Sequence, residues 1–153
     1  MYTLIGQPWK TATVVRAAQQ LFTNAPNGVT GNDDLGTMSA WYLFSALGLY
    51  PAVPGSGELL LHAPRFSNAQ IQLGNGRTLQ LQAPGADGRS LQYIQGVQFN
   101  GKPQTQVWLD WEQLRQGGTV RFALGAQAPE QGWGTAVSDL PVSYCATPGS
   151  ELK

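Results

Sequence analysis

The sequence has few of the residues that mark several classes of protein. Its single cysteine, Cys145, excludes an internal disulfide and a multi-cysteine metal site, and we expect an inert thiol there. Charged residues make up only 12% of the chain, and nine basic against nine acidic residues give a formal net charge of zero. This balance gives no electrostatic case for a nucleic-acid partner or an anionic membrane. No apolar run approaches the ~20 residues that a membrane helix needs.

The amino terminus also lacks the features of an export signal. Its first residues, MYTLIGQPWK, have no basic start, apolar core or small-residue cleavage site, so we expect no signal peptide here. What the 153 residues do contain is 42% hydrophobic side chains, sixteen glutamines and 10% aromatic residues. Such a composition is typical of one folded domain with a small appendage, whose polar surface is mostly uncharged.

Residues 1–54 carry helical signals. Pro8 suits the first turn of a helix, and an apolar face follows at spacings of three and four residues, formed by Val14, Ala17, Ala18 and Leu21. A second helix is predicted over residues 37–47, with Gly48 as its left-handed C-cap and Pro51 beyond it. This second helix is apolar on nearly all sides, so we expect neighbours from outside the chain or self-association through the exposed helix.

From residue 57 onward the apolar period changes to two. Leucines and glutamines alternate in residues 79–82, a hairpin is predicted at residues 74–77, and Asn100-Gly101 marks another turn. Short strands separated by such turns predict an antiparallel β-sandwich over residues 57–140, followed by a flexible tail over residues 141–153. The predicted fold is therefore mixed α and β, with a short helical segment followed by an antiparallel β-sandwich.

Two adjacent carboxylates precede the second predicted helix. Asp33 and Asp34 lie in the glycine-bracketed loop 31–36, where a structural role as helix caps and a functional role are both open. The N–H groups and dipole of a helix start lower a carboxylate pKa, so such a residue is ionised at neutral pH. It suits a general base or a metal ligand and is a poor general acid.

These segments resemble the C-terminal part of glycoside hydrolase family 92, which comprises calcium-dependent, inverting exo-α-mannosidases. The resemblance covers residues 2–134 and is carried by Gly6-Gln-Pro-Trp-Lys10, Gly31-Asn-Asp-Asp-Leu-Gly36, Met38-Ser-Ala-Trp-Tyr42 and Ser45-Ala-Leu-Gly-Leu-Tyr-Pro51. It implies that residues 1–54 are the last helices of an (α/α)6 catalytic barrel. One departure is Thr37, where the family pattern has Gln.

The resemblance also implies roles for individual residues. Asp34 is expected to activate the water, Asp33 to assist or to reach the outer shell of a calcium ion, and Trp9 to lie near the pocket wall. A mannose-containing glycan is the implied substrate, calcium the implied cofactor of the parent enzyme, and a periplasmic or extracellular location follows from such a substrate. Two carboxylates are fewer than the ~6–8 oxygens that calcium takes, so we expect neither calcium binding nor a metal site in this chain alone.

Inverting hydrolysis requires a protonated acid as well as a base, with carboxyl groups ~6.5–9.5 Å apart. The general acid of the family, a Glu, lies upstream of the matched region, whereas the glutamates of this chain follow the loop: Glu58, Glu112, Glu130 and Glu151. We therefore expect a C-terminal portion that carries the base loop, lacks the acid and is inactive alone.

The alternative function is a non-catalytic carbohydrate-binding or structural β-sandwich module. Trp108 and Trp111 either belong to the sandwich core, which we favour, or form an exposed pair that stacks on a sugar. His62, the only histidine, lies between apolar neighbours and is expected to be structural.

Overall fold

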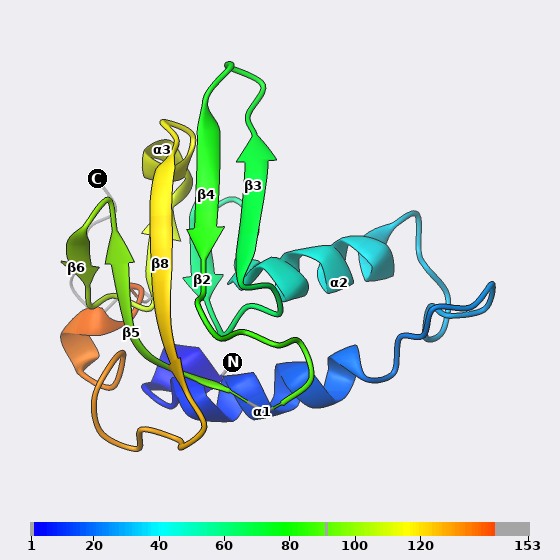
Figure 1. Ribbon diagram of the computed structural model, residues 1–153, viewed down its shortest axis with the longest axis horizontal. Helices are drawn as coiled ribbons and strands as arrows, with labels where there is room; N and C mark the ends of the chain where they lie inside the picture. The colour runs from blue at the N-terminus through cyan, green and yellow to red at the C-terminus, as the bar shows by residue number, and fades with distance from the viewer. Residues whose placement is uncertain (1, 91, 143–153) are drawn as a thin grey trace, which may run out of the picture.

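The computed structural model describes residues 2–90 and 92–142 and contains helices followed by two sheets (Figure 1). The helical part has a short 3-10 helix, η1, and the helices α1 and α2, over Tyr2–Ile5, Pro8–Gln19 and Thr37–Leu47. The remaining elements are β1 (Leu49–Tyr50), β2 (Glu58–Leu61), β3 (Asn68–Gln72), β4 (Thr78–Gln82), β5 (Tyr93–Phe99), β6 (Lys102–Gln104), β7 (Trp108–Asp110), α3 (Trp111–Leu114), β8 (Gly118–Gly125) and η2 (Val137–Asp139). The predicted tail lies almost wholly outside the described residues, and Cys145 lies outside them entirely.

Helix α1 begins at Pro8 as predicted, but the apolar face read from the sequence does not point into the protein. Val14 and Leu21 are 54% and 63% exposed, whereas the helix buries Ala12 and Gln19. The side-chain amide of Gln19 donates to the hydroxyl of Ser45 in α2 at 3.0 Å. The apolar stripe of α1 is therefore available to a neighbour outside the described chain.

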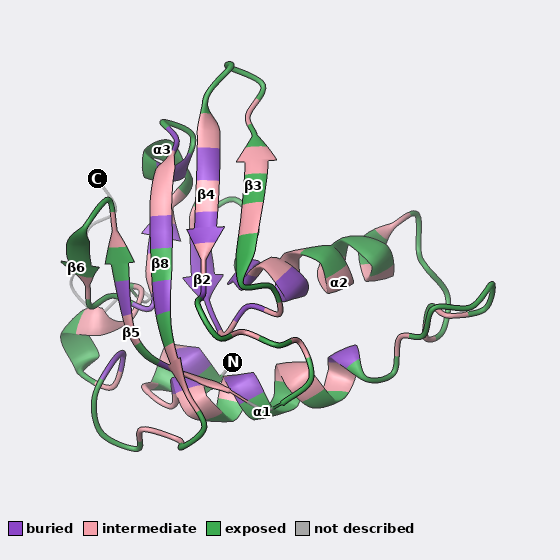
Figure 2. Ribbon diagram, viewed as in Figure 1, coloured by how far each residue is buried: buried purple, intermediate pink, exposed green. Residues whose placement is uncertain are grey.

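Helix α2 has the bounds that the sequence predicts, and Gly48 ends it with φ of 83°. A side chain is excluded at this position, because a Cβ on Gly48 would lie 2.7 Å from the carbonyl oxygen of His62. Only the last turn is buried, through Ser45 and Ala46, and Leu43 is 57% exposed. Figure 2 shows the same gradient, with burial at the sheet end of α2 and exposure towards its start.

The strands form a three-stranded sheet, β1-β2-β7, and a five-stranded sheet, β3-β4-β8-β5-β6. The first is antiparallel throughout, and both predicted turns connect antiparallel neighbours in the second, β3 with β4 and β5 with β6. The prediction of a wholly antiparallel arrangement is wrong at one place: β4 and β8 pair in parallel. This follows from β8 entering between the two hairpins, antiparallel to β5 but in the same direction as β4.

The two sheets contribute side chains to one buried cluster. The alternation predicted for β4 is confirmed, since Leu79 and Leu81 are 2% exposed while the glutamines between and after them are half-buried. The cluster contains leucines of the smaller sheet and apolar residues of the larger one: Leu49, Leu59, Leu61, Leu109, Leu79, Leu81, Val97, Val120 and Phe122. Phe44 and Leu47 of α2 pack against it, which attaches the helical part to the sheets.

No helix within the described ranges is long and apolar enough to cross a membrane. The division of the chain at residues 54–57 stays a prediction. Strand β1 precedes that point and pairs with β2, which follows it.

Candidate active site

The loop at residues 31–36 has an unusual backbone. Asp34, Leu35 and Gly36 have φ of 49°, 58° and 92°, so three successive residues are left-handed. This conformation costs a residue with a side chain about 1–2 kcal/mol, and such positions concentrate at functional sites. The loop is held to α2 by Met38 N–H, which donates to the Asp33 carbonyl at 3.1 Å, and by Thr37 N–H and its hydroxyl, which donate to the Asp34 carbonyl at 3.2 and 2.7 Å.

The side chain of Asp33 is bonded to the first turn of α2, which is close to the structural role that the sequence leaves open, although Gly36 is the N-cap residue. Its Oδ1 accepts hydrogen bonds from the backbone N–H of Ser39 at 2.9 Å and from the Ser39 hydroxyl at 2.8 Å. The hydroxyl of Ser39, followed by its N–H, lowers the pKa of Asp33 below 3.8. Asp33 is therefore an ionised carboxylate whose position is fixed by the first turn of the helix.

Asp34 differs from its neighbour in having no hydrogen bond to its side chain from any described residue. Its backbone carbonyl holds Thr37, but the carboxylate is exposed and projects from a left-handed position. Leu35, the next residue, is fully exposed as well, which is unusual for a leucine in a polar loop. These two side chains leave the loop on its solvent side and are available to a molecule beyond it.

An open groove of about 410 Å³ adjoins this loop. Ser39, which holds Asp33, and Tyr42 line one side, and the segment from Phe22 to Val29 lines the other. The Phe22 ring stacks on Trp41 at a centroid distance of 5.7 Å and packs against Tyr42 at 4.8 Å. The groove thus has an aromatic wall, and it reaches the aspartate loop only through Ser39, which bonds Asp33. The chain on the Phe22–Val29 side is largely exposed (Figure 2).

The structure does not bring Trp9 to the aspartate loop. Trp9 lies in the first turn of α1, which in Figure 1 is at the end of that helix remote from the segment leading to α2. It lines a small cavity with Leu61 and Trp133 instead. Its predicted position near a substrate pocket stays a prediction.

The predicted tryptophan pair is divided by the fold. Trp108 packs against the core, as favoured, and its Nε1 is buried without a partner among the described residues. Trp111, at the start of α3, is 44% exposed, so the core assignment is wrong for this residue. The two rings do not form a common exposed platform.

His62 is buried, as expected for a structural residue, with 6% of its surface exposed. Burial lowers the pKa of its imidazole to about 4, and the backbone of Ala63 opposes this shift. It follows β2 and has no position near the aspartate loop in the fold.

The loop at residues 31–36 offers few side-chain oxygens to a calcium ion. Asp33 is committed to Ser39, and the described ranges contain no group of three or more His, Cys, Asp or Glu side chains that could hold a metal ion. Because calcium takes ~6–8 oxygens, the carboxylates of the described residues are too few to hold the ion, and the absence of calcium binding by this chain alone stays a prediction.

Sequence reasoning missed two features of the site. Ser39 follows Asp33 by six residues, a spacing outside the usual capping box, so its role had no local signal. The groove forms because the segment from Phe22 to Val29 lies against Ser39 and Tyr42 of α2, and the spacing of apolar residues in the sequence does not predict this contact. The exposure of Leu35, in contrast, has a signal in the sequence, because this apolar residue lies inside a run of Gly, Asn and Asp.

Three comparisons with known proteins agree on the chain's relatives. The family model described as the glycosyl hydrolase family 92 catalytic domain matches residues 1–126. A protein of Arthroderma benhamiae, described as an uncharacterized secreted glycosidase, is 34% identical over 127 residues, which are 82% of this chain and 16% of the relative.

Solved structures give the same result. A family GH92 α-mannosidase from Bacteroides thetaiotaomicron matches 97% of this chain and 20% of its own length, with a TM-score of 0.87 and 28% identity. A family GH92 inverting mannosidase from the same organism matches 95% of this chain and 20% of its own, with a TM-score of 0.85 and 34% identity. The chain thus spans 16–20% of the length of these relatives.

Proposed function

Because the chain belongs to glycosyl hydrolase family 92, we propose that it is the C-terminal portion of an inverting exo-α-mannosidase acting on mannose-containing glycans. The proposal concerns the longer protein, since the chain corresponds to 20% of a solved relative described as an inverting mannosidase. In it, α1 and α2 are the last helices of an (α/α)6 barrel. The exposed Val14, Leu21 and Leu43 then face the preceding helices of that barrel.

Asp34 is the general base in this proposal. The observation that carries it is the contrast between the two aspartates: Asp33 is bonded to Ser39, and Asp34 has no protein partner in the described ranges. An ionised carboxylate with unoccupied lone pairs can accept a proton from water as the water attacks the anomeric carbon. Asp33 positions the loop through Ser39.

The general acid comes from outside the chain. Asp33 is held ionised at neutral pH, and an acid must be protonated when the leaving group departs. The described glutamates belong to the sheets and their connections: Glu58, Glu112 and Glu130. The chain therefore supplies half of the catalytic pair, and we expect no turnover of an α-mannoside by this chain alone.

The roles of the two aspartates can be separated in the longer protein that contains this chain. Asp34→Ala is expected to lower turnover of an aryl α-mannoside by about 10²–10⁴-fold, the usual contribution of a general base. Azide should partly restore it, by forming a C1–N bond on the face opposite the departing aryloxide, so the product is the β-mannosyl azide. Asp33→Ala should lower the rate without such rescue. Full activity of Asp34→Ala, or azide rescue of Asp33→Ala instead, would contradict the assignment.

A non-catalytic carbohydrate-binding role is the second candidate, and the exposed Trp111 is the observation that favours it. A single ring can stack on a sugar face, although Trp108 does not extend the surface. Titration of this chain with mannose and mannobiose distinguishes this role from the catalytic one. Binding that is abolished by Trp111→Ala would support a carbohydrate-binding module, and absence of binding would exclude it.

Two further properties follow from the proposed function. A periplasmic or extracellular location suits a glycan substrate, and the fungal relative is described as secreted. Expressed without the rest of a barrel, the chain is expected to self-associate through the apolar surface of α1 and α2. Light scattering measures this, and Leu43→Asp should shift the protein towards the monomer.

A further inference from the structure

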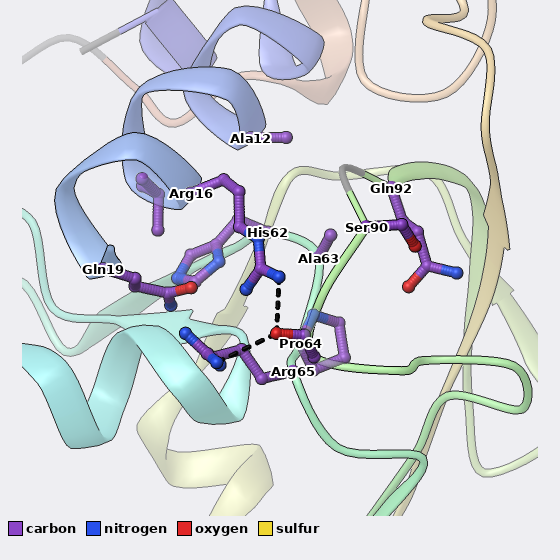
Figure 3. Close-up of a pocket in the computed structure, with 11 residues that line it drawn as sticks. Ala12, Arg16, Gln19, His62, Ala63, Pro64, Arg65, Ser90 and Gln92 are labelled. Carbon is purple, nitrogen blue, oxygen red and sulfur yellow. Dashed lines mark hydrogen bonds between the residues drawn. The ribbon is translucent and has the colours of Figure 1, made fainter. Parts of the chain in front are cut away.

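A second site lies where α1 meets the segments that flank the strands β2 and β5, and it shares no residue with the aspartate loop. It is a small cavity of about 20 Å³ between α1, the segment from His62 to Arg65 that follows β2, and the connection before β5. Figure 3 shows the guanidinium groups of Arg16 and Arg65 approaching one another in it, with His62 and Gln19 beside them. The cavity has room for one water molecule or one monatomic ion.

The charge in this cavity is positive. Arg16 and Arg65 both donate through Nη2 to one acceptor, the carbonyl oxygen of Gly88, and the bond from Arg65 is 2.9 Å long (Figure 3). No carboxylate is among the described residues that line the cavity. The charge of the neighbouring Asp87 partly offsets the positive charge, because it raises the pKa of Arg16. The Asp87 side chain does not enter the cavity lining, since it accepts from the N–H groups of Arg89 and Ser90 and from the Ser90 hydroxyl.

Two buried nitrogens around the same cavity lack protein partners. Arg16 Nε and His62 Nδ1 are both inaccessible to solvent and have no hydrogen bond to any described residue. Burial, and then the like charge of Arg65, lower the pKa of Arg16, which remains a cation. Unpaired buried donors cost free energy, and a guanidinium retains its charge at any ordinary pH.

We propose that this cavity binds a single monatomic anion of the size of chloride, held between Arg16 and Arg65. The charge favours an anion over water, because two cations share one neutral acceptor. The size excludes phosphate and sulfate, whose oxygen shells exceed the room available. An anion also provides an acceptor for Arg16 Nε–H and for the Nδ1–H form of neutral His62. The site would fix α1 against the sheets and takes no part in hydrolysis.

Thermal unfolding tests the proposal on this chain directly. The melting temperature is measured with increasing sodium chloride or bromide, and sodium gluconate keeps the ionic strength constant. The expected result is a saturable rise in Tm with chloride and bromide, whereas sulfate at equal ionic strength should give only the gradual, non-saturating rise of an excluded salt. Arg65→Gln should lose the rise. Arg121→Gln, which removes the same charge from an exposed position of β8, should retain it.

A readout that does not depend on stability keeps the test decisive if Arg65→Gln folds poorly. Crystals grown in sodium bromide should give an anomalous peak between the two guanidinium groups, and the ³⁵Cl resonance should broaden with the wild-type chain and be narrowed by bromide. No anomalous peak, density for water alone, or a saturable Tm response to sulfate equal to that for chloride would overturn the proposal. None of these outcomes bears on the roles of Asp33 and Asp34, because the two sites share no residue.

Discussion

Acidification should destabilise this protein through its one histidine. The pKa of His62 falls from 6.5 to about 4 on burial, so the folded state keeps the ring neutral while the unfolded chain takes up a proton. The contribution of His62 to the free energy of unfolding is therefore fully present above pH 6.5 and is lost as the pH falls from 6.5 through 4. At about 1.4 kcal/mol per pH unit, this interval corresponds to a loss of about 3 kcal/mol.

The measurement is urea unfolding at pH 7, 5.5 and 4, comparing the wild-type chain with His62→Gln. Sodium gluconate buffers keep the proposed anion site out of the comparison. Arg16 and Arg65, which line the same cavity, and the carboxylates are common to both proteins, so their contributions cancel. The wild type should lose about 3 kcal/mol more than the variant between pH 7 and 4. Equal losses in the two proteins would refute the assignment of a buried, neutral imidazole.

Three further results are expected. Gly48→Ala should lower the free energy of unfolding in urea by at least about 1–2 kcal/mol, because the position is left-handed and a carbonyl oxygen blocks the new Cβ. Gly31→Ala also places a side chain in a left-handed position but meets no atom, so it should lower the free energy of unfolding by less. Asp33→Ala should accelerate amide hydrogen exchange at Ser39, since two hydrogen bonds are lost, and Asp34→Asn should leave that exchange unchanged. Millimolar calcium should leave the Tm of this chain unchanged, and a saturable rise would show that the loop holds the ion without the rest of a barrel.

Local signals in the sequence predict much of the fold. Pro8 and Gly48 set helix boundaries because a missing N–H and a left-handed backbone each have a defined place in a helix. The hairpin between β3 and β4 follows in the same way from its turn residues and from alternating leucines. Each of these features depends on residues that are near one another in the chain.

Features that join distant residues could not be predicted in this way. The parallel pairing of β4 with β8 joins segments separated by two further strands of the same sheet, and no pattern within either strand specifies it. Arg16 meets Gly88 across 72 residues, so the cation pair has no sequence signal. At the candidate site, the aspartate pair was recognised from consecutive residues, but the difference between Asp33 and Asp34 required the position of Ser39.

The placement of β8 has a consequence for the order of folding. The last strand among the described residues, β8, is the middle strand of the larger sheet, between β4 and β5. During synthesis, the hairpins β3–β4 and β5–β6 therefore emerge as separate units, each with an inner edge that has no partner until residues 118–125 leave the ribosome. A polypeptide interrupted before that strand would present two unprotected edges at once, and aggregation would compete with completion of the sheet.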